Sequence, residues 1–162
     1  MYKVAIITAS DKGYAGERED KSGSVIEEIV TAHELEVTGK VILPDDRQML
    51  SDQMLNYCHQ GIDLILTTGG TGFSKRDVTP EATADIVERR ADNLTFAMIA
   101  NSLQYTPKAM LSRGIAGIRE NTLIVNLPGS PKAVRENLEY AIDAIIHCVK
   151  ILKGDDAECA RK

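Results

Sequence analysis

Apolar positions recur along this chain with two periods that alternate. Short runs rich in branched apolar residues predict buried β-strands over residues 2–9, 36–43 and 62–68. Between these runs, apolar residues three or four positions apart predict helices over residues 24–32, which Ser24 would cap, and over residues 47–60. Strands and helices alternating at this spacing are typical of an α/β protein with a parallel sheet.

The second half of the chain continues the alternation and adds a hairpin. Helices are predicted over residues 80–90, 93–103 and 131–152, and a helical turn over residues 106–113. Two strands are predicted over residues 115–120 and 122–127. Glu120-Asn121 would turn the two strands into a hairpin, and Gly154 would end the last helix. We therefore expect a doubly wound, mostly parallel sheet with helices on both faces and this hairpin in its C-terminal part. Residues 1–154 would form one domain, and the polar tail 155–162 would fray.

The loop after the third predicted strand has a composition suited to phosphate. Residues 69–77 contain three glycines, then Lys75, Arg76 and Asp77, and Thr79-Pro80 opens the next helix. Glycines leave backbone N–H groups open to a ligand, and a helix N-terminus favours negative charge. The spacing fits neither a P-loop nor a dinucleotide fingerprint. The alternative is a glycine-rich turn that only reverses the chain.

Polar turns follow four of the predicted strands. They are Ser10-Asp11, Pro44-Asp45, residues 69–77 and residues 128–131. In a doubly wound sheet, ligands bind beyond the carboxyl ends of the strands, where these turns would meet. The sequence therefore predicts one site built from four separate loops.

Composition and charge narrow the class of ligand. Apolar residues make up 43% and charged residues 27% of the 162-residue chain, which is ordinary for a soluble globular protein. The net charge of −5 disfavours nucleic acid as a partner. Cations nevertheless lie beside the candidate loops, namely Lys12, Lys21, Lys75, Arg76, Arg113 and Lys132. A small polyanion is the ligand that this pattern favours. No apolar run could span a membrane and the N-terminus enters a strand without a leader, so we expect a cytoplasmic protein.

The cysteines and histidines carry no recognisable site. Cys58, Cys148 and Cys159 match no zinc spacing, and a cytosolic chain has little use for disulfides. His59 and His147 lie next to two of these cysteines on predicted helices. We interpret these histidines and cysteines as structural residues of the core or the surface without a functional role. We expect no tightly bound protein metal and no histidine-based acid–base chemistry.

Several separated motifs together resemble one family. Residues 67–72, followed after four residues by Asp77, resemble the signature of the molybdenum-cofactor biosynthesis domain, which bacterial molybdopterin adenylyltransferases share with gephyrin and plant G domains. Further segments fit the family in order: Ser10-Asp11, residues 20–23, Pro44-Asp45, residues 111–113 and residues 126–132. The resemblance covers essentially the whole chain. One departure is Lys12, where many adenylyltransferases have arginine. Lysine keeps the positive charge but lacks the planar fork with which arginine can bind a phosphate through two hydrogen bonds.

The resemblance implies adenylylation of molybdopterin. The terminal phosphate of the pterin would attack the α-phosphorus of ATP, giving adenylylated molybdopterin and pyrophosphate. Asp45 and Asp77 align with the family's catalytic carboxylates and would be Mg²⁺ ligands. Substrate and phosphate contacts are expected from Ser10, Asp11, Ser22, Gly69, Gly70, Thr71, Gly72, Lys75, Arg113, Pro128, Gly129 and Ser130. The glycine loop, residues 69–77, would carry the phosphate cradle and a metal carboxylate at the reaction centre, and the turn at residues 128–132 would serve the pterin.

Each functional residue also has a structural interpretation. Asp45 could be a turn residue and Asp46 the helix N-cap, or the two could exchange roles. Asp77 could cap the helix that opens at Thr79. Ser130 could cap the last helix while also binding phosphate, since the two roles are compatible.

The family leaves two other function classes open. A sister branch keeps the glycine loop but typically lacks the Pro-Asp pair and the full Arg-Asp-Val-Thr-Pro string, and such a protein would bind molybdopterin without turning it over. This chain has both features. A scaffold like the G domain of gephyrin would need appended domains. Family analogy further implies a homotrimer or a hexamer, with residues 94–103 as a contact surface or a core helix, and a downstream metal-insertion enzyme as partner.

Overall fold

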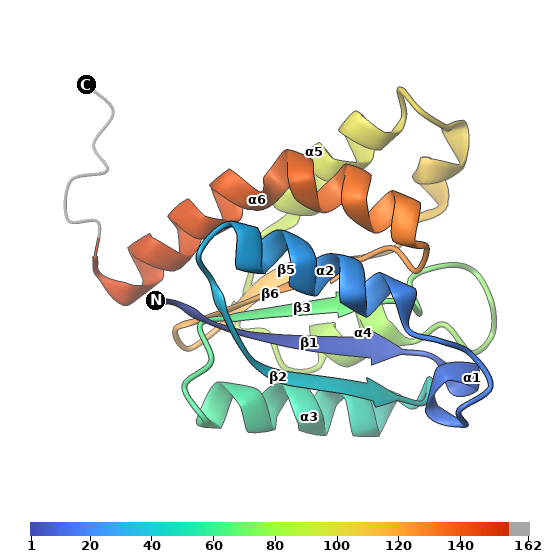
Figure 1. The fold of residues 1–162 in the computed structure, drawn as a ribbon, viewed down its shortest axis with the longest axis horizontal. Helices are drawn as coiled ribbons and strands as arrows, with labels where there is room; N and C mark the ends of the chain where they lie inside the picture. Colours follow the sequence, from blue (N-terminus) through green and yellow to red (C-terminus); the bar gives the residue numbers. More distant parts are fainter. Residues whose placement is uncertain (156–162) are drawn as a thin grey trace.

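The computed structural model describes residues 1–155 and contains one six-stranded sheet (Figure 1). Its strands are β1 (Lys3–Ala9), β2 (Glu36–Leu43), β3 (Leu64–Thr68), β4 (Arg89–Arg90), β5 (Ala116–Arg119) and β6 (Thr122–Leu127). They lie in the order β2-β1-β3-β6-β5-β4. The first three pairings are parallel, and β5 is antiparallel to both β6 and β4. The predicted doubly wound sheet and its hairpin are therefore confirmed.

Helices cover both faces of this sheet. They are α1 (Asp11–Tyr14), α2 (Lys21–Ala32), α3 (Arg47–His59), α4 (Thr79–Ala84), α5 (Asp92–Ser102), the 3₁₀ helix η1 (Pro107–Leu111) and α6 (Pro131–Lys153). Figure 1 shows α2, α5 and α6 on one face and α3 and α4 on the other.

Strand β1 shows how one sequence serves both faces. Its side chains alternate, so Val4 and Ile6 pack with α2 and α6 while Ala5 and Ile7 pack with α3 and α4. All four are fully buried. Burial on both faces explains why β1, β3 and β6 are almost continuously apolar. It also fixes their register, so that the carboxyl ends of β1, β3 and β6 meet at one edge.

The start of α2 differs from the prediction. The helix begins at Lys21 rather than after Ser24, because the carboxylate of Asp20 accepts a hydrogen bond from the Gly23 N–H at 2.9 Å and caps it. Residues 11–14, which lie outside the predicted strands and helices, form the short helix α1, which Ser10 caps by accepting from the Gly13 N–H at 2.9 Å. Polar caps thus extend helical structure into segments without an apolar stripe.

The predicted helix over residues 80–90 is too long. Helix α4 ends at Ala84, and Arg89–Arg90 form the edge strand β4. The backbone N–H groups of Glu88 and Ala91 donate to carbonyls of Ile118 and Ala116 on either side of the strand pairing. Pairing with β5 therefore outweighs the local helical pattern.

Two other expectations concern the chain's end and its helices. Gly154 ends α6 in the left-handed conformation with φ of 77°, as predicted. The fraying expected for the tail concerns mainly residues 156–162, which lie outside the described residues, as does Cys159. None of the helices within residues 1–155 has the length and apolar composition to cross a membrane.

Candidate functional site

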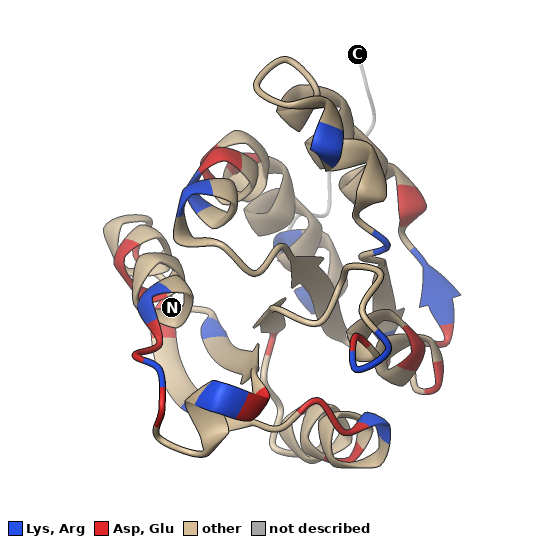
Figure 2. Cartoon of the chain, turned by 90° about the vertical axis from the view of Figure 1, so that its right-hand side faces the viewer, with Lys and Arg blue, Asp and Glu red and all other residues tan. Residues whose placement is uncertain are grey.

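A cleft of about 950 Å³ lies at the carboxyl ends of the strands, and we call it the polar cleft. It is lined by Thr8, Ala9, Ser10, Asp11, Lys12, Gly13, Arg18, Glu19, Asp20, Lys21, Ser22, Asp45, Thr68, Gly69, Gly70, Ser74, Arg76, Asp77, Gly129, Ser130 and Pro131. Figure 2 looks at this edge of the molecule and shows acidic and basic segments side by side around it. All four predicted loops contribute, so the predicted convergence is confirmed.

The glycine loop approaches the end of β1 through its backbone. Gly69 and Gly70 have φ of 87° and 68°, in the left-handed region. A Cβ on Gly69 would collide with the carbonyl oxygen of Ala9, and a Cβ on Gly70 would collide with the Thr79 hydroxyl. The Thr79 N–H donates to the Gly70 carbonyl at 3.1 Å and closes the loop. The backbone of this loop is therefore packed closely against its neighbours and forms a wall of the cleft. A turn that only reversed the chain would not require such close packing.

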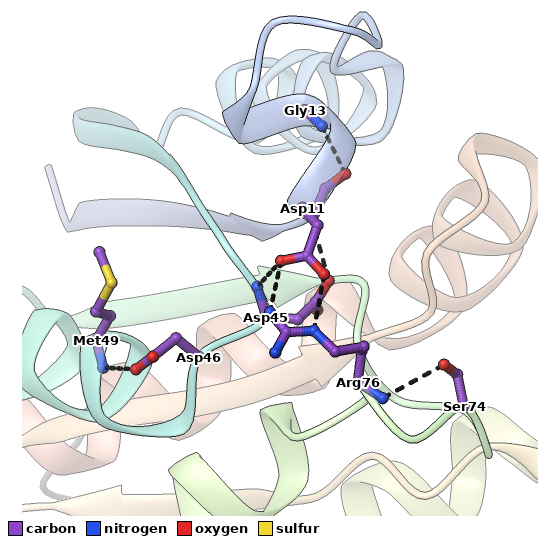
Figure 3. A network of polar contacts seen from close by, with 8 residues as sticks. Asp11, Gly13, Asp45, Asp46, Met49, Ser74 and Arg76 are labelled. Atoms are coloured by element: carbon purple, nitrogen blue, oxygen red, sulfur yellow. Dashed lines mark hydrogen bonds and ion pairs between the residues drawn. The ribbon is translucent and has the colours of Figure 1, made fainter.

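Two aspartates from different loops hold each other in the polar cleft. The Asp45 N–H donates to Asp11 Oδ1 at 3.0 Å, and the Asp11 N–H donates to Asp45 Oδ2 at 3.2 Å. Arg76 grips Asp11 with Nε and Nη2, at 3.0 and 2.9 Å (Figure 3). Hydrogen bonding to Arg76 lowers the pKa of Asp11 below its ordinary value. Arg76 thus links the glycine loop to the ends of β1 and β2.

The structure separates the roles of Asp45 and Asp46. Asp46 caps α3 by accepting from the Met49 N–H at 2.8 Å, and it points away from the cleft (Figure 3). Asp45 lines the cleft, and its Oδ1 is buried without a hydrogen-bond partner among residues 1–155. Burial raises the pKa of Asp45, and the negative charges of Asp11 and Asp77 add to the effect. A buried carboxylate oxygen without a partner is costly, and a bound cation would remove that cost.

Asp77 is not the cap of α4. The N-cap is Val78, which makes no side-chain capping bond, whereas Asp77 Oδ2 accepts from the Ser74 N–H at 3.0 Å and lines the cleft. Thr79, which no sequence motif marks as a site residue, has a fully buried hydroxyl with no partner within the described chain. Thr79 Oγ1 and Asp45 Oδ1 both lie within 3.1 Å of the point that a Gly70 Cβ would occupy. Two buried oxygens therefore lie unpaired behind the glycine loop.

The predicted serines line the cleft and also build it. Ser22 donates to the Gly129 carbonyl at 2.7 Å, which ties the start of α2 to the turn before α6. Ser130 caps α6 by accepting from the Ala133 N–H at 3.1 Å. Ser10 and Ser130 are the N-caps of α1 and α6, and Ser22 lies in the first turn of α2, so the N-terminal ends of three helices lie at the cleft wall.

A second hollow of about 300 Å³ lies beyond the glycine loop, and we call it the apolar cavity. Its wall consists of Thr71, Gly72, Thr95, Met98, Ile99, Ser102, Thr106, Lys108, Ala109, Leu111, Ser112, Gly114, Asn126, Pro128, Ala133, Glu136 and Asn137. Ser102 is 6% exposed, and its hydroxyl is buried without a partner in the part of the chain that the structure describes. Sequence reasoning missed this cavity because its wall comes from five segments with no shared motif.

The predicted contact residues divide between these two hollows. The polar cleft contains Ser10, Asp11, Ser22, Asp45, Gly69, Gly70, Asp77, Gly129 and Ser130, and the apolar cavity contains Thr71, Gly72 and Pro128. Lys75 and Arg113 belong to neither wall. Arg76 does line the polar cleft. The glycine loop and the turn at residues 128–130 therefore each run along both hollows.

Comparison with known proteins identifies the family. Residues 5–147 match the model of a family described as a probable molybdopterin binding domain. The chain belongs to this family. The resemblance drawn from residues 67–77 and the other motifs is thereby confirmed.

Three relatives of this molybdopterin-binding-domain family show how far the likeness extends. Molybdopterin adenylyltransferase of Helicobacter pylori is 39% identical over 155 residues, covering 94% of this chain and 88% of the relative. Gephyrin of Dictyostelium discoideum is 41% identical over 161 residues, covering 93% of this chain but 22% of that protein. The crystal structure of the molybdopterin biosynthesis enzyme MoaB from Thermus thermophilus is 42% identical, with a TM-score of 0.90, over 95% of this chain and 98% of that one.

Proposed function

We propose that this protein is a molybdopterin adenylyltransferase, which transfers AMP from ATP to the terminal phosphate of molybdopterin and releases pyrophosphate. Relatives with this name match the chain over nearly their whole length. One structural observation carries the assignment. Asp45 and Asp77, from loops 32 residues apart in sequence, line one cleft with the glycine loop, and Asp45 keeps a buried oxygen without a partner among residues 1–155.

The carboxylates fit a magnesium ion shared with substrate phosphates. Mg²⁺ prefers one or two carboxylates together with phosphate oxygens and water. Asp45 and Asp77 would hold it, and the unpaired Asp45 Oδ1 supplies a free lone pair. When bound, Mg²⁺ would neutralise phosphate charge and lower the barrier to displacement at phosphorus.

The remaining wall of the polar cleft would position the reacting phosphates. The N-termini of α2 and α6, which begin at Lys21 and Pro131, lie at this wall, and the positive ends of their helix dipoles would favour phosphate there. Ser130 would receive the terminal phosphate of the pterin, whose oxygen attacks the α-phosphorus. The bond from that phosphorus to the bridging oxygen of the β-phosphate breaks, and pyrophosphate leaves with the electron pair. Such transfers need in-line positioning and charge neutralisation rather than a covalent enzyme intermediate.

Arg76 is the cation that we assign to the leaving pyrophosphate, out of the three candidates Lys75, Arg76 and Arg113 that the sequence offers. It lines the polar cleft, and its partner Asp11 is exposed enough to exchange it for phosphate. Replacing Arg76 with glutamine should lower turnover at least about tenfold, because a charged hydrogen bond contributes roughly 1.5–3 kcal/mol. The neighbouring Lys75→Gln variant loses the same charge outside the cleft and should keep near wild-type turnover. Equal losses in the two variants would contradict this assignment.

The apolar cavity would hold the fused ring of molybdopterin. Met98, Ile99 and Leu111 supply apolar walls, and the unpaired hydroxyl of Ser102 can bond a ring heteroatom. The turn at Pro128–Ser130 runs from this cavity to the polar cleft, as a substrate with a ring and a phosphate requires.

Ser102→Ala tests the assignment of the ring. It should weaken molybdopterin binding about fivefold, since one hydrogen bond contributes about 1 kcal/mol, and leave ATP binding unchanged. Calorimetric titration of each ligand measures both affinities. Thermal unfolding provides the control, because removing a hydroxyl that has no partner should not lower Tm. If ATP binding falls and molybdopterin binding holds, the two compartments are reversed.

A second candidate is a protein that binds molybdopterin without turning it over. The sister branch of the family, which keeps the glycine loop, is the one expected to behave in this way. Both candidates bind molybdopterin, so turnover discriminates between them. Adding ATP, Mg²⁺ and molybdopterin should release one pyrophosphate for each pterin consumed. Saturable molybdopterin binding without pyrophosphate release would support the binding protein instead.

Assembly and cellular context extend the proposal. Helix α5 buries Met98 against the core but exposes Phe96 at its surface, and Tyr105 and Met110 are exposed nearby in the segment leading through η1. We propose that this exposed apolar surface forms the contact of a homotrimer, or of a hexamer built from trimers, in the cytoplasm. Sedimentation velocity gives the number of copies. A downstream enzyme that inserts the metal would take up the adenylylated product.

A further inference from the structure

Arg113 fastens the loop that separates the two hollows. Its backbone N–H donates to the Thr71 carbonyl at 2.8 Å, and its Nε donates to the Gly72 carbonyl at 2.8 Å. Nη2 donates to the Asp77 carbonyl at 3.0 Å, and Nη1 pairs with Glu81 Oε1 at 2.6 Å. One residue thus bonds both ends of residues 71–77 and the first turns of α4. With these bonds made, the guanidinium is used within the protein rather than held ready for phosphate.

The neighbours of Arg113 connect it to both the apolar cavity and the polar cleft. Ser112 and Gly114, on either side of it, line the apolar cavity, as does Gly72. Asp77, whose carbonyl it holds, lines the polar cleft. A ligand that packs against Ser112 and Gly72 therefore contacts the segment that fixes the backbone of a proposed catalytic carboxylate.

We infer that Arg113 is a positioning residue that couples occupancy of the apolar cavity to the placement of Asp77 in the polar cleft. The inference rests on the proposed function for the identity of the two ligands. A ring in the cavity restrains the loop at Gly72, and the guanidinium carries that restraint to Asp77. Each ligand then binds more tightly when the other is present, and the effect is reciprocal.

The geometry distinguishes this role from simple charge compensation. Arginine presents several N–H donors in one planar fork and can bond Gly72, Asp77 and Glu81 together. Lysine keeps the positive charge but cannot reproduce three bonds in these directions. If the fork matters, Arg113→Lys should be impaired nearly as much as Arg113→Gln. If only charge matters, Arg113→Lys should behave like the wild type.

The experiment is a set of binding titrations with a matched control. Affinity for α,β-methylene-ATP with Mg²⁺, an analogue whose α–β bond cannot be cleaved in the transfer, is measured with and without saturating molybdopterin. We expect the wild type to show coupling of about fivefold or more, within the usual range for linked sites, and both Arg113 variants to show a ratio near one. Arg119→Gln is the control, since Arg119 is similarly exposed but donates to the Ile86 carbonyl, and it should keep wild-type coupling. Glu81→Gln, which weakens one of the bonds, should lose part of the coupling and serves if the Arg113 variants do not fold.

Kinetics provide an independent readout. Misplacement of Asp77 should lower kcat at least about tenfold in both Arg113 variants, whereas KM for ATP at saturating molybdopterin should rise only by the coupling that is lost, about fivefold. Wild-type coupling in Arg113→Lys, or a rise in KM alone that lysine restores, would overturn the inference. Failure of the wild type to release pyrophosphate would instead refute the proposed function, and the binding titrations would still measure the coupling.

Discussion

Asp45→Asn is expected to reduce adenylylation at least about a thousandfold while the protein still folds and binds molybdopterin. Asparagine keeps the shape of the side chain but loses the charge that a magnesium ion needs. The ion contributes several kcal/mol to stabilising the transition state, and each 1.36 kcal/mol is a factor of ten in rate. Pyrophosphate release under saturating substrates measures the loss. Asp77→Asn should cause a loss of the same order.

Asp46→Asn is the matched control for this experiment. It removes the same charge one residue away, at the N-cap of α3, where asparagine caps about as well as aspartate. Turnover and Tm should therefore stay near wild-type values. A comparable loss in Asp46→Asn would mean that the negative charge of this segment, rather than the Asp45 carboxylate itself, supports the reaction. Near wild-type turnover in Asp45→Asn or Asp77→Asn would remove that residue from the metal site.

Gly70→Ala is expected to lower turnover at least about a hundredfold. The added Cβ would fall on the Thr79 hydroxyl and 3.1 Å from Asp45 Oδ1, so the loop or the carboxylate must shift. Displacement of a catalytic group by about 1 Å costs on the order of a hundredfold in rate. Stability should also fall, because the residue has φ of 68°, and alanine is strained there by roughly 1–2 kcal/mol.

Gly61→Ala separates the strain from the clash. Gly61 has a similar φ of 76°, but a Cβ there would meet no atom of residues 1–155 within 4 Å. This control should lose a few degrees of Tm, as Gly70→Ala does, and keep its turnover and its affinity for both ligands. If Gly70→Ala loses only stability and still binds ATP and molybdopterin normally, the glycine loop has a structural role alone.

Much of this fold could be predicted, because a parallel sheet covered on both faces requires a recognisable pattern of apolar residues. Val4, Ile6, Leu64 and Leu66 are fully buried, and a doubly wound sheet requires such continuous apolar strands. Since the carboxyl ends of parallel strands share an edge, the loops after them could be predicted to meet. The motif in residues 67–77 then identified the family.

The predictions that failed depend on contacts that a local pattern does not contain. Asp20 rather than Ser24 starts α2, because its carboxylate also accepts from the Thr8 hydroxyl at 2.9 Å and is held in place. Helix α4 stops early because Arg89–Arg90 pair with β5. The apolar cavity is lined, and the bonds of Arg113 are formed, by residues from segments far apart in the chain, so no local sequence pattern predicts either feature. Asp45 and Asp46 could be separated only once the cap of α3 was seen.

The transfer of labelled phosphorus tests the central claim most directly. The protein is given molybdopterin, Mg²⁺ and ATP labelled with ³²P at either the α- or the γ-position. If AMP is transferred, label from the α-position appears in the pterin product, and label from the γ-position appears only in pyrophosphate. Label from the γ-position in the pterin, or no label in the pterin from either position, would contradict this transfer of AMP.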